Sequence, residues 1–452
     1  MVFSTGLIAF FAFASISPSR SSAHAASAVA AFVACSLCAL DPSLIAHGGL
    51  MTSDTVLSLF WLVSPVLLWH SILSSSAPRY NNSANHPQPQ CHPSLPCGRI
   101  RSFFCTILRL LAAGAATGLL VASKHSGVLI APVLLAFLIL LAHFYTRTHG
   151  IFAAATFILR AAAALVVVTS SALLIFWGCY FFRFSAFADG EVGQSEMWLG
   201  LWKNADYLPQ DGLVKQVLLL LRQFNALPQA FQYGFSYAYK SALARNAFLM
   251  GEHSAGGWKS FFPIAVAIKT PVAALALLAA SSALMIFRTL FLLPIRPSVS
   301  DSSTSSPTPS LFPSLVIPFC VYWGVAIHTN LNIGHRHMLP SYPPMFIFAA
   351  YCIYLPLAAP HGPRVARFLI RALALALAAA SLAALIWEVR HHWLSPIPFF
   401  NVLVGGPSNG YKYLVDSSLD WGQDLPRFSA FVRASTCCVI AAKLTRCRYL
   451  GQ

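Results

Sequence analysis

Residues 126–143 read SGVLIAPVLLAFLILLAH, eighteen consecutive positions without an Asp, Glu, Lys or Arg. About 20 apolar residues in a helix span the hydrocarbon core of a bilayer, so this stretch predicts a membrane-spanning helix. The rest of the chain has the same character, since 57% of its 452 residues are hydrophobic and 9% are charged. Soluble domains carry about 25% charged residues. The sequence therefore predicts an all-α polytopic membrane protein.

Similar apolar runs recur along the chain and predict ten spans. Six of them would form a bundle within residues 1–182, with a cytoplasmic loop at 76–102, and four would form a second bundle within residues 262–388. A mainly helical extracytoplasmic segment at 183–261 separates the bundles, and an extracytoplasmic tail follows at 389–452. The predicted spans are residues 2–17, 25–46, 55–75, 103–122, 126–143, 153–182, 262–287, 312–329, 341–358 and 371–388.

The charged residues indicate which side of the membrane each loop occupies. The formal charge of +16 does not indicate a nucleic-acid partner, because the basic residues lie in the gaps between apolar runs. With ten spans, the basic loops at 76–102, 144–152, 288–311 and 359–371 share one side, which the positive-inside rule makes cytoplasmic. Of the thirteen acidic residues, Asp301 alone belongs to that side. Polar chemistry is therefore expected on the extracytoplasmic face.

Two residues between early spans are candidates for a site on that face. A carboxylate at a membrane boundary is costly unless it is solvated or paired. Asp54 either caps, with Thr52 and Ser53, a helix that begins at residue 55, or also faces a cavity. Lys124 lies between two closely joined spans, where it either extends to the interface or meets an anionic head group.

Two cationic sites lie at the outer ends of later spans. Arg336 is flanked by His335 and His337, and its guanidinium is a rigid donor fork suited to phosphate; the alternative is a basic cluster that only ends a helix. This spacing is weak support for a metal, so no metal site is predicted. Lys269 lies one or two turns inside the seventh predicted span, where a lysine usually pairs with an anion. That anion is either a structural carboxylate or a ligand.

The stretch at residues 401–428 combines turn-forming glycines with acidic and aromatic side chains. Residues 411–415 are predicted to form a strand. Beyond it, acids, an amide and a tryptophan suit the hydroxyls and the face of a sugar, and the alternative is a solvated loop. The residues concerned are Asp420, Trp421, Gln423 and Asp424. Together, the polar clusters predict a membrane protein that handles an anionic, phosphorylated amphiphile at its outer face, without naming a reaction.

Five blocks of the chain resemble, in order, blocks of the dolichyl-phosphate-mannose protein mannosyltransferase superfamily. The similarity is greatest to its bacterial members, the phospholipid-carrier-dependent glycosyltransferases, and it extends from about residue 5 to residue 428. GHRH followed by LP, and SSLDWGQDL, are the most specific motifs. The blocks are LDPSLIAHGGLMTSD (40–54), SKHSGVLIAPVLL (123–135), GEHSAGGWKSFFPIAVAIKTP (251–271), NIGHRHMLPSYP (332–343) and GGPSNGYKYLVDSSLDWGQDL (405–425).

The resemblance implies the helical bundle of type C glycosyltransferases. Such enzymes transfer a sugar from a polyprenyl-phosphate donor to a protein, glycan or lipid acceptor at the extracytoplasmic face, usually with inversion. By resemblance Asp54 is the catalytic carboxylate, and Arg336, His337, Lys124 and Lys269 are candidates for the donor phosphate. Candidates for sugar or acceptor contact are Asp420, Trp421, Gln423, Asp424 and Glu252. The membrane would be the plasma membrane in a bacterium or that of the endoplasmic reticulum in a eukaryote.

The chain also departs from the family. Members begin with one more span and a large outer loop that carries an acidic pair, whereas Met1 falls in what resembles the second span and no acidic pair precedes Asp54. We therefore expect a truncated copy of a mannosyltransferase-like enzyme of protein glycosylation. The alternatives are a catalytically inactive, lipid-binding relative and, third, a transporter. The sequence leaves open the sugar, the acceptor and whether a divalent cation is needed.

Overall fold

A computed structural model of the chain describes residues 1–16, 21–50, 52–76, 97–186, 212–243, 245–291, 310–358, 363–390, 392–393 and 395–434. The structural statements below concern these residues.

The described residues confirm a polytopic helical protein. Eight helical stretches are long and apolar enough to cross a membrane. Two further predicted spans are shorter apolar helices, α1 (Val2–Ala14) and α13 (Pro313–His328). The longer stretches comprise α2 (Ser21–Leu40), α4 (Ser53–Ser76), α5 (Cys97–Ser123), η1 with α6 (His125–Leu129 and Ile130–His149), α7 (Ile151–Cys179), α12 (Val272–Phe291), η3 with α14 and α15 (His335–Ser341, Tyr342–Ala349 and Tyr351–Ala358), and α16 (Arg364–Val389).

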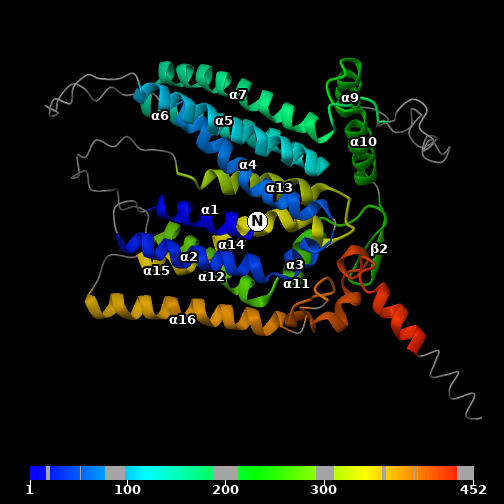
Figure 1. The fold of residues 1–452 in the computed structure, drawn as a ribbon. Helices are drawn as coiled ribbons and strands as arrows, with labels where there is room; N and C mark the ends of the chain where they lie inside the picture. The colour runs from blue at the N-terminus through cyan, green and yellow to red at the C-terminus, as the bar shows by residue number, and fades with distance from the viewer. Residues whose placement is uncertain are drawn as a thin grey trace, which may run out of the picture.

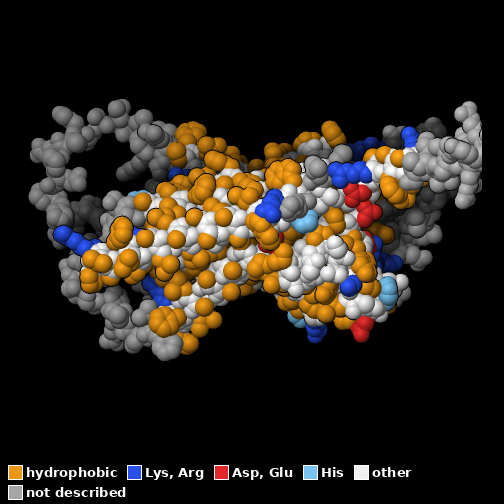
Figure 2. Space-filling model, turned by 90° about the horizontal axis from the view of Figure 1, so that it is seen from below, with side chains coloured by type: hydrophobic (Ala, Val, Ile, Leu, Met, Phe, Trp, Pro, Cys, Tyr) orange, Lys and Arg blue, Asp and Glu red, His pale blue; other side chains and the backbone are white. Residues whose placement is uncertain are grey.

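These helices lie roughly along one common axis (Figure 1). The elements expected outside the membrane gather at one end of the bundle, where α9 and α10 run across its axis, and the connection from α6 to α7 and the start of α16 lie at the other end. Figure 2 shows that the acidic side chains visible on one face lie in the half toward α9 and β2, while the opposite end shows Lys and Arg. The end elements are α3 (Pro42–Gly48), α9 (Leu213–Gln223), α10 (Gln229–Leu243), the hairpin β1–β2 (Ala247–Leu249 and Glu252–Ser254), α11 (Phe261–Lys269), and the short helices η4 (Val402–Val404), η5 (Pro407–Lys412) and η6 (Asp416–Ser418).

The seventh predicted span is interrupted between α11 and α12. Pro271 follows Thr270, and a proline has no N–H to continue a helix. α12 then begins at Val272, whose N–H donates to Glu388 Oε2 of α16 at 2.8 Å. A carboxylate at a helix N-terminus satisfies an orphan donor and interacts favourably with the helix dipole. This contact ties the break to α16.

Small residues allow α5 and α7 to pack closely. A Cβ at Gly114 would lie 2.5 Å from the carbonyl oxygen of Val168, and one at Gly118 would clash with the carbonyl oxygen of Ala172. The two glycines form a GxxxG sequence, which brings helix backbones close together in a bilayer, where van der Waals contact rather than the hydrophobic effect drives helix association. This packing supports α5, which Lys124 directly follows.

A valine at Gly118 should destabilise the bundle, because it would force α5 away from α7. We expect a loss of about 1–3 kcal/mol, the usual cost of overpacking, measured by thermal or denaturant unfolding of the purified chain in detergent. The matched control is Gly324→Val on α13, where an added Cβ would meet no atom within 4 Å. Equal stability of the two variants would contradict the close packing of α5 on α7.

Candidate functional site

A buried carboxylate lies between two cations at the end of the bundle that carries α9 and α10. Asp54 Oδ1 is 2.5 Å from Lys124 Nζ, and Asp54 Oδ2 is 3.4 Å from Arg336 Nη1. The Asp54 side chain is 1% exposed, whereas those of Lys124 and Arg336 are 21% and 18% exposed. The structure therefore brings together three predicted site residues, separated by 70 and 282 positions from Asp54 in the chain.

Each of the three residues is held by a different element. Asp54 lies in the first turn of α4. Because its carboxylate also pairs with Lys124 and Arg336, its role extends beyond the start of the helix. Lys124 precedes η1, whose Gly127 lies so close to α5 that a Cβ there would clash with the carbonyl oxygen of Leu120. Arg336 belongs to η3, which begins directly after Gly334. The three elements thus meet at the edge of the membrane-spanning region.

Aromatic side chains fix η3 against α4 and α13. Tyr322 of α13 donates its hydroxyl hydrogen to the backbone oxygen of His337 at 2.6 Å. The same ring meets Trp61 of α4 edge to face, with centroids 5.2 Å apart. These contacts place η3, and with it Arg336, over the start of α4.

Two more predicted residues join the cluster. His337 Nδ1 is 3.2 Å from Lys124 Nζ. The guanidinium carbon of Arg336 lies 4.3 Å from the centroid of the Trp421 ring, and Trp421 is 41% exposed. The Trp421 ring therefore covers one side of the Arg336 guanidinium, and the ring itself remains partly exposed to solvent.

The cluster has two cationic side chains and one carboxylate. Burial lowers the pKa of Lys124 from its ordinary value, and Asp54 acts in the opposite direction by favouring the charged ammonium. Because two cations share one carboxylate, the cluster has a net positive charge, and it lies where few water molecules can compensate that charge. The cluster therefore favours the binding of an anionic ligand.

A cavity of about 190 Å³ reaches this cluster. Lys124 is the cation in its lining, and the polar lining residues are His125, Ser126, Thr329 and His337. α10 packs over the η1 side of the cavity, where Gly234 lies against the ring of His125. The remaining lining is largely apolar and comes from η1, α10, α11, α13 and the segment after α13. Its residues include Leu129, Ala238, Phe262, Tyr322, Val325, Ala326 and Leu331. The cavity thus has a charged end at Lys124 and a largely apolar wall.

Lys269 was predicted to pair with a structural carboxylate or with a ligand, and its hydrogen-bond partners in the structure are backbone carbonyls. Its side chain is buried, and Nζ donates to the carbonyl oxygens of Ile397 and Ser418, both at 2.7 Å, while lying 4.4 Å from the centroid of the Phe400 ring. These contacts tie α11 to the tail rather than to the Asp54 cluster. The structure therefore gives Lys269 a structural explanation, and we leave it out of the phosphate site.

The other residues predicted to contact sugar or acceptor form local contacts in the tail. Asp420 Oδ1 accepts from the N–H of Gly422 at 2.8 Å, and Gln423 Nε2 donates to Asp424 Oδ2 at 3.1 Å. Glu252 is exposed on β2. Of this group, Trp421 is the residue whose side chain contacts the cluster.

The predicted strand at residues 411–415 is wrong. η5 extends from Pro407 to Lys412, and η6 follows at Asp416–Ser418. The N–H of Tyr413 bonds to the nearby carbonyl of Gly410 at 3.0 Å. The glycines of this stretch favour such tight local turns over an extended ladder.

Two buried residues and a cation near the cluster are not among the predicted site residues. His47, near the end of α3, is 4% exposed, and its Nδ1 has no hydrogen-bond partner in the described part of the chain. Arg245, just before β1, acts electrostatically on His337. Asp41 caps α3 by accepting from the N–H of Leu44 at 2.8 Å, and burial raises its pKa to about 7. Their position next to the predicted outer loops is the sequence signal that could have found these residues.

Acid should destabilise the protein through His47. Burial lowers the pKa of His47 to about 4 from 6.5. Because the folded value lies below the unfolded one, the stabilising contribution of neutral His47 is complete above about pH 6.5 and is lost as the pH falls toward 4. At about 1.36 kcal/mol per pKa unit, the effect is on the order of 3 kcal/mol.

The measurement is thermal unfolding of the wild type and of His47→Gln between about pH 7.5 and pH 4.5. The wild type should lose more stability than His47→Gln over this range. The control is His253→Gln, which changes an exposed histidine on β2 and should follow the wild type. Parallel curves for wild type and His47→Gln would contradict the burial of a neutral imidazole.

Among the residues that the structure describes, no three His, Cys, Asp or Glu side chains are grouped so as to hold a metal ion.

Comparison with protein-family models, with curated proteins and with solved structures finds no match for this chain.

Proposed function

We propose that the protein is a membrane glycosyltransferase that transfers a sugar from a polyprenyl-phosphate donor to an acceptor at the extracytoplasmic face. The observation that carries the proposal is the position of Asp54 between Lys124 and Arg336, beside a cavity with an apolar wall. A lipid-linked phosphate needs cations and an apolar surface together. The resemblance in sequence to the mannosyltransferase superfamily supports the same function.

The donor phosphate would bind to Lys124 and Arg336. A guanidinium and an ammonium are the usual partners of phosphate oxygens, and both side chains are partly exposed. The first isoprene units would lie along Leu129, Tyr322 and Val325, which line the same cavity. The phosphate would then share the two cations with Asp54.

The transfer itself needs an acid–base group and charge stabilisation. An oxygen of the acceptor attacks the anomeric carbon from the side opposite the phosphate, and the bond between that carbon and the phosphate oxygen breaks. The electron pair of this bond leaves with the polyprenyl phosphate, whose negative charge Lys124 and Arg336 stabilise. The acceptor proton passes to Asp54, which acts as general base. The product is the inverted glycoside.

Trp421 would contact the transferred sugar. Its ring already stacks on Arg336 and is partly exposed. An aromatic face next to the phosphate site suits the apolar face of a hexose. Asp420, Gln423 and Asp424, in the same turn, remain candidates for hydroxyl contacts.

A lipid-binding protein without transfer activity is the second candidate. The cavity and the two cations of the cluster that it reaches favour binding of a lipid phosphate whether or not a reaction follows. The two functions differ in the role of Asp54, which is a base in the enzyme and a partner of the cations alone in the binding protein. Separate measurements of binding and turnover distinguish them.

Substitution of Arg336 should weaken donor binding. Arg336→Gln removes one of the two cations, and hydrogen bonds to charged groups contribute about 1.5–3 kcal/mol, so the Kd for a polyprenyl-phosphate sugar should rise about 10- to 100-fold. Binding can be measured by titration of the donor in nanodiscs. Arg364→Gln, at the opposite end of the bundle in α16, is the control and should leave the Kd unchanged. An unchanged Kd for a folded Arg336→Gln variant would exclude the phosphate role.

Asp54→Asn in the same assay separates the enzyme from the binding protein. In the enzyme, loss of the general base should reduce turnover about 100- to 10,000-fold, while donor binding persists. Transfer is followed with radiolabelled sugar on candidate protein, glycan and lipid acceptors. Donor binding without transfer by the wild type, on every acceptor class, would favour the lipid-binding protein.

A further inference from the structure

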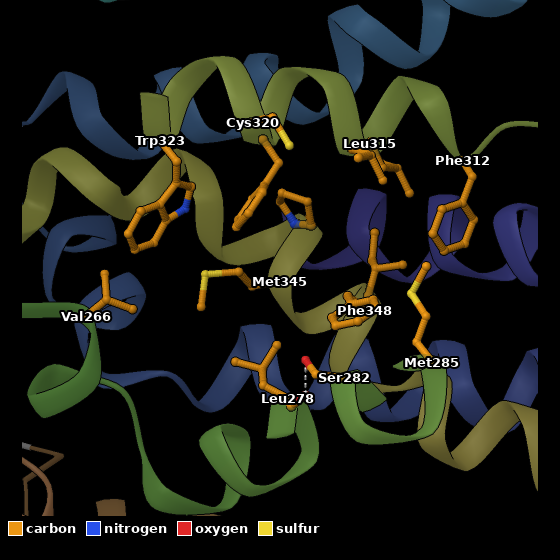
Figure 3. Close-up of a pocket in the computed structure, with 14 residues that line it drawn as sticks. Val266, Leu278, Ser282, Met285, Phe312, Leu315, Cys320, Trp323, Met345 and Phe348 are labelled. Atoms are coloured by element: carbon orange, nitrogen blue, oxygen red, sulfur yellow. Dashed lines mark hydrogen bonds between the residues drawn. The ribbon is translucent and has the colours of Figure 1, made fainter. Parts of the chain in front are cut away.

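A second and larger cavity lies on another face of α13. It has a volume of about 510 Å³ and is enclosed by side chains of α11, α12, α13 and α14 (Figure 3). In this view the rings of Trp323 of α13 and of Phe312, the residue before α13, extend toward the side of the cavity on which Leu278 and Met285 of α12 lie. The full lining is Val266, Leu278, Ser282, Met285, Phe312, Leu315, Val316, Phe319, Cys320, Trp323, Pro344, Met345, Ile347 and Phe348.

This cavity is distinct from the one at the charged cluster. The two cavities share no lining residue. On α13 the cluster cavity uses Tyr322, Val325 and Ala326, while the second cavity uses residues from Phe312 to Trp323 on other faces. No Asp, Glu, Lys, Arg or His lines the second cavity. It therefore suits a hydrocarbon chain and not a head group.

The dimensions of the cavity match one leaflet. Its α13 lining runs from Phe312 to Trp323, eleven residues apart, which at about 1.5 Å per residue is roughly 16 Å. Half of a hydrocarbon core about 30 Å thick is close to this length. Phe312 and Met285 lie at one end of the cavity, and Val266 lies at the other (Figure 3). Since α12 ends and α13 begins at the end with Phe312, this is the end away from the charged cluster.

The cavity opens toward the surrounding lipid. Met285 and Val316 are 44% and 45% exposed, although both line it. Both belong to helices of the membrane-spanning bundle. A chain from the bilayer can therefore enter from the side, without passing through the protein.

A cation stands at the end of the cavity that holds Met285 and Phe312. Arg288 lies in the last turn of α12, one turn beyond Met285, and is exposed. Its Nη1 donates to Tyr351 Oη at 3.3 Å, which holds the guanidinium beside α15. A guanidinium has five donors, and the others suit a phosphate. By the distribution of basic loops, this end faces the cytoplasm.

We propose that this cavity binds one acyl chain of an anionic phospholipid of the cytoplasmic leaflet, with the lipid phosphate at Arg288. The chain fills the apolar cavity over the depth of a single leaflet, and the head group stays at the membrane surface. The site is separate from the proposed donor site and does not depend on transferase activity.

The test is native mass spectrometry of the full chain with phosphatidylglycerol and phosphatidylcholine of the same acyl chains. Ser282→Phe fills the cavity at a position whose hydroxyl bonds only within its own helix among the described contacts, to Leu278 O at 2.9 Å. This variant should lose a tightly bound phosphatidylglycerol. Ala376→Phe, at an exposed position of α16, is the control and should keep it.

Arg288→Gln tests the head-group contact without changing the cavity. It should reduce the preference for phosphatidylglycerol over phosphatidylcholine about fivefold, the factor for about 1 kcal/mol per basic residue at a membrane surface. Thermal unfolding of both variants shows whether they fold. A folded Ser282→Phe that binds phosphatidylglycerol like the wild type would overturn the proposal, as would an Arg288→Gln without effect on preference. If Ser282→Phe lost bound polyprenyl phosphate but kept bound phosphatidylglycerol, the proposal would be overturned, and the cavity would instead be an isoprenoid site.

Discussion

A carboxylate at the edge of a bilayer is stable only where cations or water compensate its charge, and Asp54 meets this constraint through Lys124 and Arg336. The pairing joins the start of α4, the turn after α5 and the start of η3. Removal of one partner from a buried ion pair typically costs about 3–5 kcal/mol, because it leaves the other charge uncompensated. This end of the bundle is therefore organised around this contact, and the same excess of cations makes it receptive to an anionic ligand.

A second set of polar contacts supports the first. Lys269 binds two carbonyl oxygens that lie 128 and 149 positions later in the chain, so it anchors the tail onto α11. The anchored tail carries Trp421, which covers Arg336. α13 in turn contributes to both cavities, one beside the cluster and one open to the lipid. A change in α13 would therefore affect both the proposed donor site and the proposed phospholipid site.

Much of this arrangement could be predicted from the sequence. Long apolar runs predicted the spans, and the count of spans with the positions of Arg and Lys placed Asp54, Lys124 and Arg336 at the same end. What a single sequence does not contain is which of these side chains touch. It could not show that one carboxylate serves two cations, or that Lys269 is satisfied by distant carbonyls. The strand predicted at residues 411–415 is absent because the glycines of this stretch form tight turns in place of an extended chain. The spacing of Gly114 and Gly118 was a signal for close helix packing, which hydropathy alone does not detect.

The central claim is that Asp54 and Arg336 meet at one end of the bundle, and intramolecular cross-linking tests it most directly. Cysteines at positions 54 and 336, in a chain whose native cysteines are replaced by serine, should be joined in intact membranes by a short thiol-specific reagent. A pair at positions 54 and 364, at the starts of α4 and α16, which lie at opposite ends of the bundle (Figure 1), should not be joined. Cross-linking of the first pair alone is the predicted result. Failure of the first pair to react in a folded chain, or an equal reaction of the second, would contradict the account.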